Sequence, residues 1–159
     1  MPSVSIIQHA KGAPGLRTLG LGPNLKPQKA LKKLQFLMNN YAFWAKNRSL
    51  DQLKIMLKNS SVITSVWFEE NMIGFGRAHS DEFFRAILWD IIVADDMQGK
   101  GIGKLIVDSL TNAPEIKNVE KVYLMTTNSK EFYSQIGFNT SSSQTLLSLN
   151  KSKKESLTN

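Results

Sequence analysis

The feature that most constrains this chain is the stretch 91–105, IIVADDMQGKGIGKL, where an apolar, strand-like segment leads into three alternating glycines. After the glycines, apolar residues recur at the spacing of one helix face: Ile102, Leu105, Ile106 and Leu110. The first turn of a helix has backbone amides without partners in the helix, and the helix dipole adds partial positive charge there. The stretch therefore predicts a strand, a turn and a buried helix whose start holds an anion such as a phosphate.

Spacing excludes two other glycine motifs. A Walker A loop has four residues between its first glycine and a Gly-Lys-Ser/Thr end, whereas three separate Gly99 from Gly103, and Leu105 follows Lys104. A dinucleotide fingerprint needs a small residue where Lys104 stands. A glycine-rich turn that holds no ligand is the remaining alternative.

Two motifs resemble the GNAT N-acetyltransferase superfamily. Gln98-x-x-Gly101-x-Gly103 is similar to its acyl-CoA signature, Q/R-x-x-G-x-G/A. After the strand-like run 121–127, the chain reads EFYSQIGF, which resembles the FY-x-x-x-GF element that ends the superfamily's acyl-CoA core. Residues 73–93 look most like small acetyltransferases of cyanobacteria and plastids, which are similar to enzymes that acetylate protein amino groups or small arylalkylamines such as serotonin.

The resemblance implies a mixed α/β fold of the GNAT type, with a largely antiparallel, twisted sheet that splays at its centre and is flanked by helices. A chain of 159 residues is long enough for one self-sufficient core. We expect a single domain over 1–159, with the acyl-CoA core at 62–149 and a polar tail at 151–159. The implied location is the plastid or chloroplast stroma, or the cytoplasm of a cyanobacterium.

The resemblance also implies acetyl-CoA as co-substrate and assigns its contacts. Backbone groups at the strand end would pair with pantetheine and donate to the thioester carbonyl: Ile91, Ile92 and Val93. The turn and the helix start would hold the diphosphate: Gln98, Gly99, Lys100, Gly101, Ile102, Gly103 and Lys104. Asn128 is a further expected contact, although it lies only five residues before Tyr133, closer than the family's common spacing. A second departure is Ala94-Asp95-Asp96, which stands where a proline is usual.

Tyr133 matches the tyrosine of the FY-x-x-x-GF element, which implies that its phenol is the general acid for the departing thiolate. The alternative is a helix tyrosine that packs between Phe132 and Phe138. We expect Tyr133→Phe to lower turnover much more than acetyl-CoA affinity.

Asp90 interrupts an apolar strand next to the predicted site, and a buried carboxylate needs a partner or a task. Strand alternation predicts that it faces away from Trp89 and Ile91. Its role is open at this point. Asp90 is a candidate catalytic base or amine-binding group, or else a structural acid paired with an arginine such as Arg77 or Arg85. A water chain is an equal candidate for the base.

The composition narrows the chemistry. The chain has no cysteine, which excludes disulfides, Cys-ligated zinc and a cysteine nucleophile. Direct transfer from thioester to amine is therefore expected, without an acyl-enzyme. His9 and His79 are 70 residues apart and make a poor metal site, so we expect no metal.

The net charge of +7 lies in the first third of the chain, where residues 1–50 hold eight Lys or Arg and no acid. These cations can steer CoA, an acidic protein substrate or RNA, or form the solvated face of a helix. A basic RNA- or ribosome-binding module and a non-catalytic CoA-binding protein are therefore alternative functions, although no RNA-binding signature is present. No apolar run approaches the roughly 20 residues that cross a bilayer. We expect no membrane or nucleic-acid partner; the acceptor, a protein or small-molecule amine, and the oligomeric state are not specified.

The remaining patterns predict the element order. Strands are expected at 4–9, 62–68, 72–78, 85–93, 121–127 and 144–149. A helix is expected from Pro27 to about Ala45, and a capping box of Ser49 and Gln52 predicts the start of another. Residues 12–23 are expected to form a loop, and Asn71 to take the left-handed position of the hairpin between 68 and 72.

Overall fold

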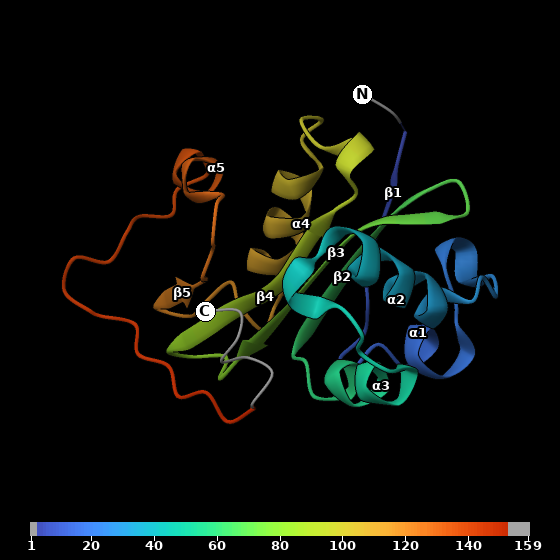
Figure 1. Ribbon diagram of the computed structural model, residues 1–159, viewed down its shortest axis with the longest axis horizontal. Helices are drawn as coiled ribbons and strands as arrows, with labels where there is room; N and C mark the ends of the chain where they lie inside the picture. The colour runs from blue at the N-terminus through green and yellow to red at the C-terminus, as the bar shows by residue number, and fades with distance from the viewer. Residues whose placement is uncertain (1–2, 153–159) are drawn as a thin grey trace. The chain divides into compact units, whose positions relative to one another are not determined.

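The computed structural model describes residues 3–152, which form two compact units divided between Met125 and Thr126. The unit up to Met125 contains, in chain order, β1 (Ser5–Gln8), α1 (Pro14–Leu19), η1 (Pro23–Leu25), α2 (Ala30–Tyr41), η2 (Phe43–Ala45), α3 (Leu50–Lys58), β2 (Val62–Phe68), β3 (Asn71–Ser80), β4 (Arg85–Val93), η3 (Asp95–Met97), α4 (Ile102–Thr111) and β5 (Lys121–Tyr123) (Figure 1). The unit from Thr126 contains α5 (Lys130–Gln135). The expected single domain over 1–159 stays a prediction.

The five strands form one sheet in the order β1-β2-β3-β4-β5. Neighbouring strands are antiparallel except for β4 and β5, which are parallel. β5 pairs with only the first three residues of β4, Arg85 to Ile87, and β4 then continues to Val93 without it. The mixed α/β fold with a largely antiparallel, splayed sheet is confirmed.

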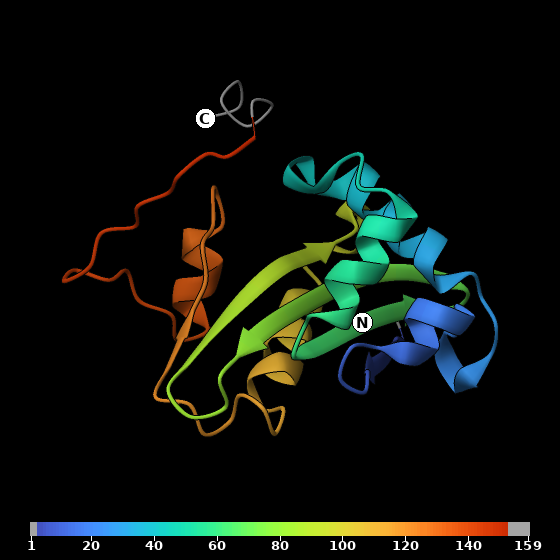
Figure 2. The ribbon, with the colours of Figure 1, turned by 90° about the horizontal axis from the view of Figure 1, so that it is seen from below.

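Helices cover both faces of the sheet: α2 and α3 lie on one face and α4 on the other (Figure 2). Helix α4 approaches β3 closely because Gly74 and Gly76 have no side chain. A Cβ at Gly76 would stand 2.6 Å from Cγ2 of Ile106. The predicted apolar face of α4 is buried at Ile102, Ile106 and Leu110. This packing holds the start of α4 at the end of β4.

A bulge interrupts β4 at Asp90. The register with β3 shifts between Phe75 and Arg77, and Asp90 has a left-handed φ of 53°. Trp89 pairs with Arg77 across the ladder, and Asp90 contacts the Arg77 side chain, so both lie on the face of Arg77. The prediction that Asp90 faces away from Trp89 was therefore wrong, because the extra residue breaks the alternation. The prediction that Asp90 faces away from Ile91 is correct, because Ile91 lies beside Ile106 and Leu110 on the α4 face.

The N-terminal third differs from its prediction at two places. Helix α2 begins at Ala30, and Pro27 instead forms an isolated bridge with Leu21. The helix ends at Tyr41, and a 3-10 turn follows at 43–45. Residues 12–23, expected as a loop, contain α1, because a proline is tolerated in the first turn of a helix and the buried Leu16 anchors it.

The local cap of α3 is confirmed. The Ser49 hydroxyl accepts the Gln52 amide at 3.1 Å, and the Gln52 side chain accepts the Ser49 amide at 2.9 Å. The next turn differs from expectation, because Glu69 takes the left-handed conformation and Asn71 already belongs to β3.

The later strands are shorter than predicted. β5 ends at Tyr123 and not near 127. Residues 144–149 form no strand, and their leucines are exposed, because a run of apolar residues does not by itself supply a neighbouring strand. Most of the predicted polar tail, from 153 onward, lies outside the described residues.

Candidate functional site

The glycine turn joins β4 to α4. Gly99 and Gly101 have left-handed φ values of 74° and 81°, which other residues adopt only with strain. A Cβ built on either glycine would meet no atom of the described residues within 4 Å, its immediate chain neighbours aside. The backbone of the turn is therefore open to a ligand on the side where side chains would otherwise stand.

Helix α4 begins without a side-chain cap and without an acid in its first turn. Within residues 3–152, the amides of Gly101, Ile102, Gly103 and Lys104 have no hydrogen-bond acceptor. Lys100 is exposed beside them, whereas the Lys104 ammonium pairs with Asp108 at 2.7 Å. The start of α4 thus offers donors and positive charge to an anion, as the sequence predicted.

Gln98 braces the turn against the strand. Its backbone N–H donates to the Asp95 backbone carbonyl at 3.3 Å, and its side-chain Nε2 donates to the Val93 carbonyl at 3.2 Å. The Ala94 amide donates to the Ile73 carbonyl at 2.9 Å. These bonds fix the strand end relative to the glycines, while a contact of Gln98 with CoA stays a prediction.

Ile91, Ile92 and Val93 lie on β4 beyond the last residue that pairs with β5. Because the two strands separate there, this edge of β4 has no strand partner in the described part of the chain. The pairing of these backbone groups with pantetheine stays a prediction.

Asp90 is the centre of a part-buried charged cluster on the opposite face from α4. Its Oδ1 accepts the Trp44 indole N–H at 2.8 Å. Its Oδ2 accepts Nε of Arg77 at 2.7 Å and Nη1 of Arg48 at 3.1 Å. The Asp90 side chain is 4% exposed, so all of its charge is balanced by protein groups.

Opposing effects act on the pKa of Asp90. Burial raises it, but the charges of Arg77 and Arg48, together with hydrogen bonds from Arg77 and Trp44, lower it by more. The pKa of Asp90 therefore lies below its ordinary value, and the carboxylate is a weak base at neutral pH. Of the alternatives that the sequence left open, the pairing with Arg77 is present, whereas Arg85 pairs with Glu120 at 3.0 Å.

Arg48 and Trp44 were not among the predicted site residues. They lie 42 and 46 residues before Asp90 in the chain. The available signal was a lone acid in an apolar strand, which requires partners, together with a first third that carries only cations. Neither observation selects these two residues, because their meeting with β4 depends on how α2 and α3 pack.

The C-terminal unit holds the other predicted residues. The Tyr133 ring lies edge-on to Phe132 and Phe138, with ring centroids 4.9 Å and 5.9 Å away. Burial raises the pKa of Tyr133, so its phenol keeps its proton at neutral pH. The Asn128 side-chain oxygen accepts the Ser129 hydroxyl at 3.3 Å. The catalytic role of Tyr133 and the cofactor contact of Asn128 stay predictions.

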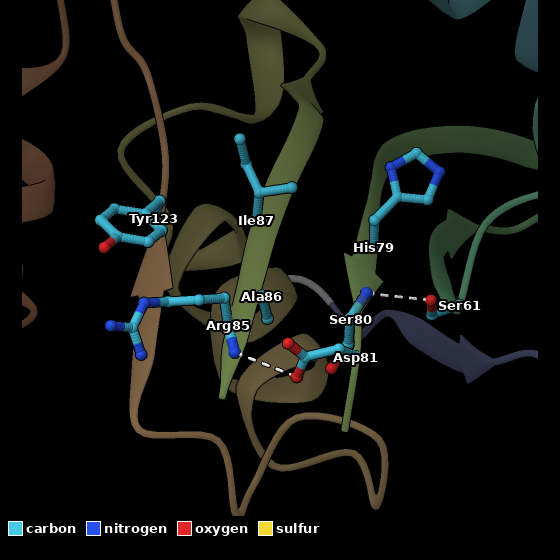
Figure 3. A pocket seen from close by; sticks show the side chains of 8 residues that line it. All are labelled: Ser61, His79, Ser80, Asp81, Arg85, Ala86, Ile87 and Tyr123. Atoms are coloured by element: carbon cyan, nitrogen blue, oxygen red, sulfur yellow. Dashed lines mark hydrogen bonds between the residues drawn. The ribbon is translucent and has the colours of Figure 1, made fainter. Parts of the chain in front are cut away.

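A separate open pocket of about 420 Å³ lies at the start of β4, the end remote from the glycine turn (Figure 3). It is lined by Ser61, His79, Ser80, Asp81, Arg85, Ala86, Ile87 and Tyr123. Asp81 Oδ1 already accepts the amides of Phe83, Phe84 and Arg85. Burial, and then the charge of Arg77, lower the pKa of His79. None of the predicted site residues lines this pocket.

The sequence matches the family described as acetyltransferase (GNAT) domain over residues 59–140. An uncharacterized N-acetyltransferase, ycf52, from the red alga Gracilaria tenuistipitata is 33% identical over 96 residues, which are 57% of this chain and 53% of that protein. A ycf52-like N-acetyltransferase from the cyanobacterium Prochlorococcus marinus is 31% identical over 85 residues, 51% and 47% of the two chains. GCN5-related N-acetyltransferase 2, chloroplastic, from Arabidopsis thaliana is 35% identical over 71 residues, 44% and 28%.

The fold agrees with solved structures. A GNAT-family acetyltransferase from Streptococcus pneumoniae has a TM-score of 0.68 at 18% identity, over 94% of this chain and 100% of that one. The chain belongs to the GNAT acetyltransferase family. It spans about half the length of the ycf52 proteins that it matches.

Two further findings concern residues 3–152. No group of three or more metal-ligating side chains is placed there to hold an ion. No helix in this part has the length and apolar character needed to cross a membrane.

Proposed function

We propose that this chain is an acetyl-CoA-dependent N-acetyltransferase that moves the acetyl group directly to a primary amine. The observation that carries the proposal is the start of α4, where the amides of 101–104 have no acceptor among the described residues and the turn before them is open at Gly99 and Gly101. CoA carries a diphosphate, the anion that such a helix start binds. Membership of the GNAT family supports the same co-substrate.

The residues present fit this ligand. The amides of 101–104 and the Lys100 ammonium would hold the diphosphate. The edge of Ile91 to Val93 that has no strand partner among the described residues would pair with the pantetheine arm. Acetyl-CoA supplies the reactive thioester. Backbone donors at this strand end would stabilise the negative charge that develops on the carbonyl oxygen when the amine attacks.

Transfer forms a C–N bond and breaks the C–S bond, so the leaving sulfur requires a proton. Tyr133 is the proposed donor. Burial raises the pKa of Tyr133, which keeps its proton available at neutral pH. With no cysteine in the chain, transfer proceeds without an acyl-cysteine intermediate.

The acceptor must lose a proton to become a neutral nucleophile. The role of Asp90 as this base stays a prediction. Two guanidinium groups pair with its carboxylate and keep it ionised. Its surroundings support the alternative role, a structural acid, and a water chain then carries the proton to solvent.

The proposed acceptors are protein α-amines or lysines, or small arylalkylamines, in line with the resemblance. The proposed location is the plastid or chloroplast stroma, or the cytoplasm of a cyanobacterium. Its support is that the relatives include a protein named chloroplastic and one from Prochlorococcus.

The test is release of CoA thiol from acetyl-CoA with a panel of peptide and small-molecule amines. The protein contributes no thiol of its own, so every thiol detected comes from CoA. We expect release that depends on the amine and an acetylated product of matching mass. Binding of acetyl-CoA without turnover of any amine would instead indicate a CoA-binding protein. RNA binding without any affinity for acetyl-CoA would indicate the RNA-binding alternative.

A further inference from the structure

The cluster around Asp90 has unequal charge. Arg48 and Arg77 bring two positive charges, and Asp90 brings one negative charge, with both guanidinium groups on the same oxygen. Within residues 3–152, no other acid pairs with either arginine. One positive charge is therefore left uncompensated in a part-buried position, which favours the binding of an anion.

The uncompensated charge is accessible on Arg48. Its side chain is 30% exposed, against 12% for Arg77. Arg77 additionally reaches the Ser60 hydroxyl at 3.4 Å, whereas among residues 3–152 Nη1 of Arg48 contacts, besides Asp90, only the sulfur atoms of Met38 and Met56. A guanidinium has five N–H donors, so Arg48 keeps donors for an external group.

Arg48 lies near the strand end where the acceptor amine would meet the thioester. Asp90 immediately precedes Ile91, so the guanidinium on its carboxylate lies one side chain away from the strand end proposed to hold the thioester. The diphosphate is proposed to bind at α4, on the other face of the sheet. The face of α2 and α3 is thus left for the acceptor.

The surroundings of Arg48 also favour an anionic group. Trp44, whose indole is bonded to the same carboxylate, is 47% exposed as a residue, and Phe43 packs edge-on against it with ring centroids 5.2 Å apart. Residues 1–50, which include this segment, contain no acid. A polycationic acceptor would find like charge here, whereas a carboxylate would find a forked donor beside an apolar surface.

We propose that Arg48 is a specificity-determining residue that binds an anionic group of the acceptor, so that the preferred substrates are primary amines that also carry a carboxylate. This inference rests on the proposed function and names the substrate class of that site. The carboxylate can belong to a free amino acid or to an acidic residue next to the amine of a peptide. Both sources present the same planar group to the guanidinium.

The experiment compares matched acceptors at equal concentrations of neutral amine. One arm uses peptides that begin Ala-Asp or Ala-Asn, and the other uses phenylalanine or its amide. We expect the wild-type protein to prefer the anionic member of at least one pair by about tenfold or more in kcat/KM, mainly through KM. Arg48→Gln should bring this ratio near one, and Arg48→Lys, which keeps the charge but not the fork, should restore part of it.

Lys46→Gln is the matched control, because it removes a nearby exposed cation that has no bond to Asp90. It should leave the preference unchanged, and thermal unfolding should show that all variants are folded. Calorimetric titration of the same acceptor pairs into the CoA-loaded protein measures the preference without turnover. If no amine releases thiol, the proposed function fails, and this calorimetric arm still decides the role of Arg48.

A wild-type protein without preference in either arm, or one that favours cationic acceptors, would overturn the inference. So would an anionic preference that persists in Arg48→Gln. Loss of the preference in Lys46→Gln as well would mean that general surface charge, and not Arg48, selects the acceptor.

Discussion

The Trp44 indole donates to Oδ1 of Asp90 at 2.8 Å and so joins η2 to the bulge of β4. Arg48, which lies just before the N-cap of α3, donates to the other oxygen of the same carboxylate. Asp90 therefore fastens the connection between α2 and α3 to the strand that leads into the glycine turn. This tie links the helical layer to the proposed reaction centre.

Asp90→Ala should lower the free energy of unfolding by about 3 kcal/mol, because two part-buried guanidinium groups lose their carboxylate. Asp90→Asn should cost less, since asparagine tolerates the left-handed φ and keeps an oxygen for Trp44. Trp44→Phe removes the indole donor together with part of the ring system and should cost about 1 kcal/mol. Denaturant unfolding measures all three. Asp96→Ala, at an exposed position, is the control and should change the free energy of unfolding little. A change just as small in Asp90→Ala would contradict the stabilising role of the Asp90 cluster.

His9 should make stability depend on pH. Its Nε2 lies 2.8 Å from Oγ of Ser65, which already accepts the Trp67 indole at 2.9 Å, so a neutral ring can accept the Ser65 proton. Burial lowers the pKa of His9 from its ordinary value of 6.5 to about 4. Between these pH values the unfolded chain binds a proton that the folded chain does not. Stability should therefore fall as pH drops through this window, by up to about 3 kcal/mol.

The measurement is urea unfolding at several pH values between 4 and 7. His9→Gln should remove most of the slope in this range. The pKa values of Asp81 and Asp90 are lowered, so these carboxylates take up protons and reduce stability only at more acidic pH. An unchanged slope in His9→Gln would show that other groups cause it.

Gly76→Ala should destabilise the fold by about 1–3 kcal/mol, because its new Cβ would stand 2.6 Å from Cγ2 of Ile106 and 3.0 Å from Cδ1 of Leu110. Gly15→Ala is a suitable control, since the nearest atom there is 3.4 Å away and alanine favours the helix. Equal midpoints of thermal unfolding for the two variants would show that α4 is free to move away from β3.

Features that depend on neighbouring residues were predicted well from the sequence. The capping box of Ser49 and Gln52 depends on two side chains three residues apart, and both of its bonds are present. The glycine turn and the apolar face of α4 are likewise properties of one short stretch. The extent of β4 followed from its continuous apolar character.

Features that depend on distant partners were not predictable in the same way. The orientation of Asp90 depends on a bulge that exists only in the pairing with β3. Arg48 and Trp44 reach Asp90 only through the packing of helices on the sheet. Residues 144–149 carry three leucines and were expected to form the last strand, but strand formation needs a paired neighbour.

Tyr133→Phe should lower turnover by about a hundredfold or more, because the leaving thiolate loses its proton donor. Affinity for acetyl-CoA should change little, since the phenol acts on the departing sulfur. Steady-state rates and calorimetric titration of the same preparation separate the two quantities. Phe132→Leu, which alters the ring packing but keeps the phenol, is the control; an unchanged turnover in Tyr133→Phe would leave the tyrosine a packing residue.

Whether the start of α4 binds acetyl-CoA is decided by calorimetric titration of acetyl-CoA at low salt into the wild-type protein and into Gly101→Val. We expect one site in the wild type, with affinity that falls as salt rises, and at least about tenfold weaker binding in the folded variant. The valine side chain would fill the open space beside the turn and would also strain its left-handed φ. Lys100→Gln should weaken binding less. No binding of acetyl-CoA to the wild type, or equal binding to Gly101→Val, would contradict the account.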